Sequence, residues 1–157
     1  MEITQKINSI QEIQDSLKEA LEKNVYFAAS KIPVVCENSA QIEYMIKNSL
    51  GKIGAICVVQ TPTLEYFGKD EDGHPVWTLP EATIVVSEIP TTNRSRAGSS
   101  TALDAALQAA EALNELGSGI LLKQIYQVEN QGVVSVFLTF ETSVHFGYFR
   151  NDLVDMK

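Results

Sequence analysis

The sequence contains few cysteines and few basic residues, and each shortage argues against a class of protein. Two cysteines, Cys36 and Cys57, are too few for a disulfide scaffold or a cysteine metal cage. Lys and Arg number 12 against 20 Asp and Glu, a formal net charge of −8. This balance argues against a protein that coats DNA or RNA, because phosphate binding needs clustered basic side chains.

Long apolar runs are also absent from the sequence. No run approaches the ~20 residues needed to cross a bilayer, and residues 1–6 do not resemble a signal-peptide start. We therefore expect no membrane span and no signal peptide. The 157 residues, 45% of them apolar, suit one globular domain over residues 1–157, and no repeat or linker divides them.

Apolar periodicity predicts the elements of the first half of the chain. Apolar residues spaced three or four apart predict an amphipathic helix from about Thr4 to Lys23, which Asn24 ends. The proline of Ile32–Cys36 predicts a strand start or a sheet edge there. The other elements expected here are a helix capped by Asn38 or Ser39 and ended by Gly51, a strand at Gly54–Gln60 that is covered on both faces, and its extension over Thr63–Phe67.

The second half of the chain is predicted to form strands before and after one helix. Asp72-Gly73 predicts a hairpin turn, and Pro80 predicts a break or bulge between two strand runs. The expected elements are strands at Val76–Thr78 and Ala82–Ile89, a loop at Pro90–Ser100, a helix at Thr101–Leu116 with Leu103, Leu107, Ala110 and Leu113 inward, a strand at Ile120–Val128, a turn at Asn130–Gly132, and a strand at Val133–Phe146. Together they predict an α/β (α+β) fold, a mainly antiparallel twisted sheet flanked by helices, with a long C-terminal β-hairpin.

The last of these strands is unusually long. At ~3.3 Å per residue, Val133–Phe146 spans roughly 46 Å, whereas a compact domain of this length is roughly 40 Å across. Such a strand either bends at a bulge over its own core or projects beyond it. Projection would require a neighbouring subunit to cover the apolar face, so Phe137, Val144 and Phe146 are candidate interface residues.

The loop before the Ala-rich helix is a candidate anion-binding or partner-binding loop. Its polar residues are Asn93, Arg94, Arg96, Ser99 and Ser100. Free backbone N–H groups, the helix dipole and two arginines all favour an anion at a helix start. The loop lacks the spacing of a phosphate loop. The alternative is a basic loop that caps the helix or forms a salt bridge with an acidic neighbour.

Other reactive residues do not form a catalytic set. One acidic cluster lacks the spacing of a calcium loop and is interpreted as a solvated turn; it contains Asp70, Glu71, Asp72 and His74. Glu141 and His145 share one strand face without a nucleophile nearby. The two cysteines lie in apolar runs and read as small core residues. We therefore expect no enzymatic activity, no metal and no cofactor.

The order of the elements resembles that of bacteriophage tail-terminator and tail-completion proteins. The likeness covers roughly residues 1–147 and is carried by Ala82–Arg94, the helix Thr101–Leu116 and the strand that ends in Phe137–Glu141. The resemblance implies a homo-oligomeric ring, usually of six subunits, that caps the tail tube and meets the head-completion proteins. It also implies a place in the tail or neck of the virion, after assembly in the cytoplasm of a bacterial host, and no contact with a membrane.

The resemblance further implies that DNA passes through the ring without being specifically bound. The acidic composition fits such a passage, because like charges repel phosphates. Two other functions remain open from the sequence. One is a small anion- or nucleotide-binding domain that uses the loop of Arg94 and Arg96. The other is a small bacterial enzyme whose site forms only between subunits.

Overall fold

The chain folds as a mixed α+β structure around one sheet. The computed structural model describes residues 9–116 and 119–145, and the side chains of residues 144 and 145 are not described. Within these residues the helices are α1 (Ile10–Lys23), α2 (Val25–Ala29), α3 (Ile42–Lys52), α4 (Pro90–Asn93) and α5 (Ala102–Asn114). The strands are β1 (Val34–Cys36), β2 (Ala55–Val59), β3 (Glu65–Lys69), β4 (Pro75–Glu88), β5 (Leu121–Asn130) and β6 (Val133–His145).

The six-stranded sheet has the order β1-β2-β4-β6-β5, and β3 pairs with β4 off this path. Only the β1–β2 pair is parallel among the described strands, which confirms the predicted, mainly antiparallel α+β class with its β5–β6 hairpin. Strand β1 lies at an edge, as Pro33 predicts, and β2 is buried along its whole length. The β5–β6 turn has two residues at positive φ, Gln131 and Gly132, which suits the twist of a tight hairpin.

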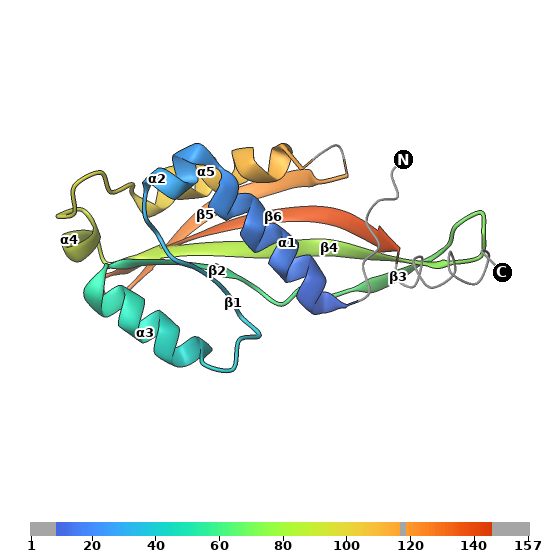
Figure 1. Ribbon diagram of the computed structural model, residues 1–157, viewed down its shortest axis with the longest axis horizontal. Coiled ribbons are helices and arrows are strands. Elements are labelled where there is room, and N and C mark those ends of the chain that lie inside the picture. Colours follow the sequence, from blue (N-terminus) through green and yellow to red (C-terminus); the bar gives the residue numbers. More distant parts are fainter. Residues whose placement is uncertain (1–8, 117–118, 146–157) are drawn as a thin grey trace.

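Helices cover the two faces of the sheet unequally. Figure 1 shows α1, α2 and α5 on one side of the sheet and α3 on the other. The main core lies under α1, α2 and α5, and it includes Leu21, Phe27 and Phe140. Helix α3 packs on β1 and β2, where a smaller cluster contains Val35, Ile56 and Val58.

Helix α5 turns mainly alanines, together with Leu113, toward the sheet. Its buried residues are Ala102, Ala105, Ala106, Ala109, Ala112 and Leu113. Of the four predicted inward residues, Leu113 is buried and Ala110 is partly buried against the core, but Leu103 and Leu107 are 44% and 55% exposed, so the prediction was wrong for these two. A methyl side chain lets the helix backbone come close to the sheet, and larger side chains on that face would hold the helix away from it.

Helix α1 begins later than the prediction and is followed by a helix that was not predicted. Helix α1 begins at Ile10 because the Ser9 hydroxyl accepts the Glu12 amide. Asn24 ends α1 as predicted, but its backbone is extended and its side chain caps α2, a helix that the pattern did not predict.

Helix α3 begins and ends later than the prediction. Asn38 donates to Gln11 and the Ser39 hydroxyl lies 3.5 Å from the sulfur of Met45, so neither caps the helix, which begins at Ile42. At the other end, α3 continues through Gly51 to Lys52.

Strands β4 and β5 each contain a bulge, and the end of β4 that pairs with β3 extends past α1. β4 runs unbroken through Pro80 with a bulge between Leu79 and Ala82, and β5 has a bulge between Leu122 and Gln124. Both bulges lie beside Phe140 of β6, so the strand pairing is interrupted on both sides of β6 at the same position along it. Beyond this level β3 and β4 form the hairpin that projects past the end of α1 in Figure 1.

The close contact of α5 with the sheet can be tested by exchanging side-chain sizes. Ala109 is fully buried, so Ala109→Leu should lower the free energy of unfolding by about 1–3 kcal/mol through overpacking. The control is Leu107→Ala on the outer face, which should change it by less than about 0.5 kcal/mol. Urea denaturation of both variants measures the difference. Equal effects of the two substitutions would show that the alanine face does not set the helix position.

Candidate functional site

The predicted anion-binding loop surrounds a carboxylate that belongs to the protein. Glu88 is the last residue of β4 and is only 1% exposed. One oxygen, Oε1, accepts from Asn93 Nδ2 at 2.8 Å and from Arg94 Nε at 3.3 Å. The other, Oε2, accepts from Arg94 Nη2 at 3.0 Å and from the Ala102 backbone N–H at 2.8 Å. The side chain therefore joins the end of β4, the loop and the first turn of α5.

The single turn α4 places the donors around Glu88. Pro90 stands in the first turn of α4, where its fixed φ suits a helix start. Asn93 ends this turn and is fully buried; besides Glu88, its Nδ2 reaches the carbonyl oxygen of Ser100 at 2.8 Å. Its Oδ1 accepts from Arg96 Nη2 at 2.6 Å. Asn93 thus connects the two ends of the loop.

A glycine allows α4 to sit against the start of β2. Gly54 has φ +85°, and a Cβ there would lie 2.4 Å from the backbone nitrogen of Asn93. Its carbonyl oxygen accepts the Ile89 amide at 2.7 Å. Both the positive φ and the close approach require glycine. Gly54 therefore helps to fix Asn93 beside Glu88.

Electrostatics favours the ionised form of Glu88. Burial raises the pKa of Glu88, but hydrogen bonds from Arg94, the Ala102 amide and Asn93 outweigh burial and leave the pKa below its ordinary value. The carboxylate also lies at the N-terminus of α5, where the helix dipole favours a negative charge. Two of the residues predicted to bind an external anion, Asn93 and Arg94, thus donate to an internal one.

The structure brings the five predicted loop residues together without leaving their polar groups directed at one open site. Arg96 also reaches the Ser30 carbonyl oxygen at 3.4 Å, which ties the loop to the end of α2. Ser99 and Ser100 are half-buried, and Ser100 contributes its carbonyl rather than its side chain to the Asn93 contact. These contacts match the alternative interpretation, a loop that pairs with an acidic neighbour. That neighbour, Glu88, was not singled out from the sequence.

The acidic hairpin tip forms its own turn. One oxygen of Asp70 accepts the amides of Asp72 and His74, each at 2.9 Å. Side-chain atoms of Asp70, Asp72 and His74 lie within 4.8 Å of one another, close enough for a shared cation. The amide bonds to Asp70 account for this closeness as turn geometry. The absence of a bound metal stays a prediction.

The two cysteines are structural core residues, as predicted. Cys36 is 8% exposed and Cys57 is fully buried, and neither forms a disulfide. Burial raises the pKa of both thiols, strongly so for Cys57. Each therefore stays a neutral thiol, the unreactive form. The predicted Glu141–His145 pair is not described, because the side chain of His145 lies outside the described residues.

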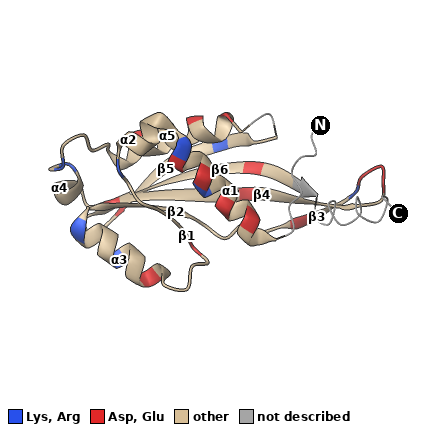
Figure 2. Ribbon diagram, in the orientation of Figure 1, with Lys and Arg blue, Asp and Glu red and all other residues tan. Residues whose placement is uncertain are grey.

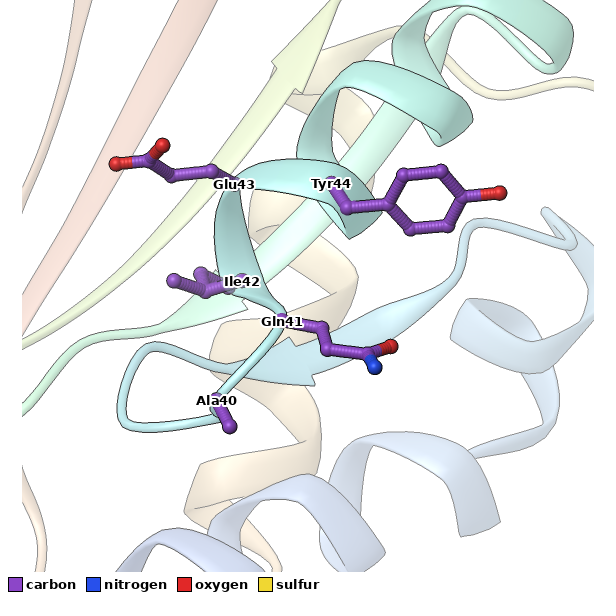
Figure 3. A pocket seen from close by; sticks show the side chains of 5 residues that line it. All are labelled: Ala40, Gln41, Ile42, Glu43 and Tyr44. Atoms are coloured by element: carbon purple, nitrogen blue, oxygen red, sulfur yellow. The ribbon is translucent and has the colours of Figure 1, made fainter.

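A broad hollow of about 640 Å³ lies at the start of α3. It is lined by Ala40, Gln41, Ile42, Glu43 and Tyr44. Figure 3 shows these side chains pointing apart, with Glu43 and Ile42 on one side and Gln41 and Tyr44 on the other. A ligand site needs polar groups that converge on one point. The hollow therefore does not carry a site.

No protein-family model matches this chain, and no curated protein sequence is significantly similar to it. Among the described helices, none has both the length and the apolar character that spanning a bilayer requires.

The role of Glu88 can be tested by replacing its carboxylate. Glu88→Gln would place an amide nitrogen among donors, so it should lower the free energy of unfolding by about 1–3 kcal/mol. The control is Glu81→Gln, an exposed residue of the same strand, which should have little effect. Thermal and urea unfolding measure both variants. Equal stability of Glu88→Gln and the wild type would contradict the structural role.

The lowered pKa of Glu88 also predicts a pH dependence. A depressed carboxyl pKa contributes stability above the unfolded-state value, ordinarily 4.5, and loses it as pH falls toward the folded value. The stability difference between wild type and Glu88→Gln should therefore be constant near neutral pH and shrink below about pH 4.5. Urea denaturation at a series of pH values measures this difference. A gap that widens on acidification would contradict it.

Proposed function

We propose that this chain is a non-enzymatic subunit of a virion, which forms a ring with copies of itself at the end of a phage tail tube and joins it to the head or neck. The ring, the tail-tube and head-completion partners, and the location in the virion follow from the resemblance described above. The observed α+β class, with a mainly antiparallel sheet between helices, is the class that this resemblance implies.

The polar chemistry of the described chain supports a structural role over a catalytic or ligand-binding one. The densest group of charged and amide side chains, around Glu88, is bonded within itself and to the start of α5. Arg94, whose side chain is 52% exposed, donates two hydrogen bonds to Glu88, and an anion that took over these two donors would displace an almost completely buried carboxylate. This displacement would leave an unpaired buried charge, which is costly.

The observation that carries the proposal is the apolar surface. Large apolar side chains are exposed on α5, on β3 and above all on β5. They include Tyr66 at 55%, Phe67 at 75%, Leu107 at 55% and Leu121 at 60%. Scattered apolar side chains are normal on a surface, but grouping along an edge strand and a projecting hairpin favours contact with another chain.

The predicted interface residues lie on or near this surface where they are described. Phe137 is half-buried on β6 and stacks on Tyr126 of β5, with ring centroids 5.0 Å apart. Phe146 and the side chain of Val144 lie outside the described residues. Acidic residues appear along α1 and at the tip of the β3–β4 hairpin in Figure 2, so faces that carry them would repel DNA rather than hold it.

The mass of the purified protein in solution tests the proposal. We expect a closed oligomer with a mass that is a fixed multiple of 17.3 kDa, and a ring in negative-stain images. Light scattering over a range of concentrations measures the mass. A chain that stays monomeric at every concentration would contradict the proposal, and so would measurable turnover of a substrate.

Phosphate separates this proposal from the anion-binding alternative. Because Arg94 donates to Glu88 and Arg96 donates to Asn93, phosphate or a nucleotide should leave the melting temperature unchanged in wild type and in Arg96→Ala. A genuine site saturated at 100 times its Kd would add about 2.7 kcal/mol of stability. A saturable rise that Arg96→Ala abolishes would establish the anion-binding function instead.

A further inference from the structure

The charged side chains of the described residues separate toward the two ends of the long axis of the molecule. Figure 2 shows basic residues at the end that carries α4, and acidic residues at the tip of the β3–β4 hairpin at the opposite end. The protein as a whole has a formal net charge of −8. The end at α4 is therefore a local exception on an acidic protein.

Three side chains form what we call the basic end: Lys31, Lys52 and Arg96. They are brought together by the packing of the segments that carry them. Arg96 Nη2 lies 3.4 Å from the carbonyl oxygen of Ser30, the residue before Lys31. Lys52 ends α3 two residues before Gly54, whose backbone packs against Asn93, and Asn93 accepts from Arg96. The ends of α2 and α3 therefore meet the loop that follows α4.

The positive charges of the basic end are not neutralised within the described part of the chain. The ion pairs among the described residues all involve other basic groups. Arg96 donates to two uncharged oxygens, one of a backbone carbonyl and one of an amide side chain. Lys31 and Lys52 are exposed. Arg94 lies in the same loop but is not counted, because it pairs with Glu88.

The opposite end carries the complementary charge. We call residues 70–72 the acidic tip. Asp70 accepts two amides of its own turn, so it is largely used within the hairpin. Glu71 and Asp72 are exposed, and neither carboxylate forms an ion pair with another described residue. Lys69 precedes the three acidic residues and leaves the tip negative.

Exposed apolar side chains accompany the charges at both ends. Tyr66 and Phe67 on β3 lie in the same hairpin as the acidic tip, and both are largely exposed. Val25 and Tyr26 on α2, the helix that ends just before Lys31, are also largely exposed. Protein interfaces combine an apolar centre with a polar rim. A phosphate backbone would leave the apolar side chains of α2 uncovered, so these neighbours favour a protein partner at the basic end.

We propose that the acidic tip of one copy of this chain docks on the basic end of the next copy. Charge complementarity selects the second copy, because Glu71 and Asp72 bring the carboxylates that the basic end lacks. Contacts between two tips or between two basic ends would bring like charges together, which is destabilising. The inference rests on the proposed function, and it names the two surfaces through which the ring would close.

The positions of the two surfaces suit a head-to-tail contact. Figure 1 places α4 and the β3–β4 hairpin at opposite ends of the molecule, so one copy can contact two neighbours at once. The two surfaces differ, and the contact is therefore heterologous. Heterologous contacts generate a ring when the rotation between neighbours closes, and an open chain of subunits when it does not.

The experiment reverses the charge of each end in a separate variant. The tip variant is Glu71→Lys/Asp72→Lys, and the end variant is Lys31→Glu/Lys52→Glu. Arg96 is kept, because its hydrogen bonds hold the loop. In either variant alone like charges oppose each other at every contact, so association should weaken at least about tenfold. In an equal mixture each tip finds an end of opposite charge, so the mixture should recover the wild-type mass.

Sedimentation velocity over a concentration series measures the masses, and circular dichroism verifies that each variant folds. The matched control is Glu81→Lys/Glu111→Lys, which changes the net charge as the tip variant does, at exposed positions on β4 and α5. The control should keep the wild-type mass. The wild type gives a check without substitution. The screening length falls from about 10 Å at 0.1 M salt to about 3 Å at 1 M, so its association should weaken as salt is raised.

The outcomes separate this contact from the ring. Lower mass in each variant alone, with recovery in the mixture, supports the contact. The same pattern in a wild type whose mass grows without limit would support the contact and contradict the closed ring. An oligomeric wild type whose mass neither variant changes would overturn the contact and leave the ring intact, whereas a wild type that is always monomeric would overturn both.

Three further results would overturn the contact alone. One is a mixture that stays dissociated, because the two ends would then not be partners. Another is wild-type association that salt does not weaken. The third is binding of a DNA duplex that the end variant loses while its mass is unchanged, which would assign the basic end to a polyanion instead.

Discussion

The buried carboxylate of Glu88 is the interaction on which the arrangement of the molecule depends. It lies at the end of β4, a strand that pairs with β2, β3 and β6. Its bonds to Asn93, Arg94 and the Ala102 amide fix the loop that carries the chain from the sheet to α5. A charge removed from water is stable only when such donors surround it. The Glu88 carboxylate therefore links the end of β4 to the start of α5, and the fold must keep this buried charge paired.

The pairing of Glu88 with the loop affects which groups remain at the surface to contact other molecules. Asn93 and Arg94 of the loop donate to Glu88, while large apolar side chains are exposed on α5, β3 and β5. Burial of apolar area away from water is favourable, and opposite charges that meet at a contact fix the orientation of the two partners. The apolar and charged side chains at the two ends of the molecule thus favour association between copies.

Local patterns predicted the fold well where the signal lies in neighbouring residues. The hairpin turn at Asp72-Gly73 and the bulge at Pro80 follow from backbone preferences alone, and the structure confirms both. The inward face of α5 was predicted correctly at Leu113 but wrongly at Leu103 and Leu107, because leucine is more hydrophobic than alanine, although alanine permits the close approach. The short helices α2 and α4 were missed because each depends on one side chain or one proline.

The sequence indicated the hydrogen-bond donors of the candidate site but not the carboxylate that accepts from them. Asn93, Arg94 and Arg96 stood out as polar residues before a helix, whereas their acceptor, Glu88, stands in an apolar strand where it resembles an outward-facing residue. The burial of Glu88 depends on the turn of α4 and on the close contact of Gly54 with Asn93, and no local sequence pattern predicts either feature.

Amide hydrogen exchange of the wild-type protein tests assembly through the β3–β4 hairpin most directly. The measurement compares concentrated with dilute protein, residue by residue along β3 and along the loop around Glu88. The account predicts that outward amides of β3 exchange slowly only when the protein is concentrated, while the Asn93 and Ala102 amides are protected at both concentrations. Exchange of the β3 amides that is equally fast in both samples would contradict it.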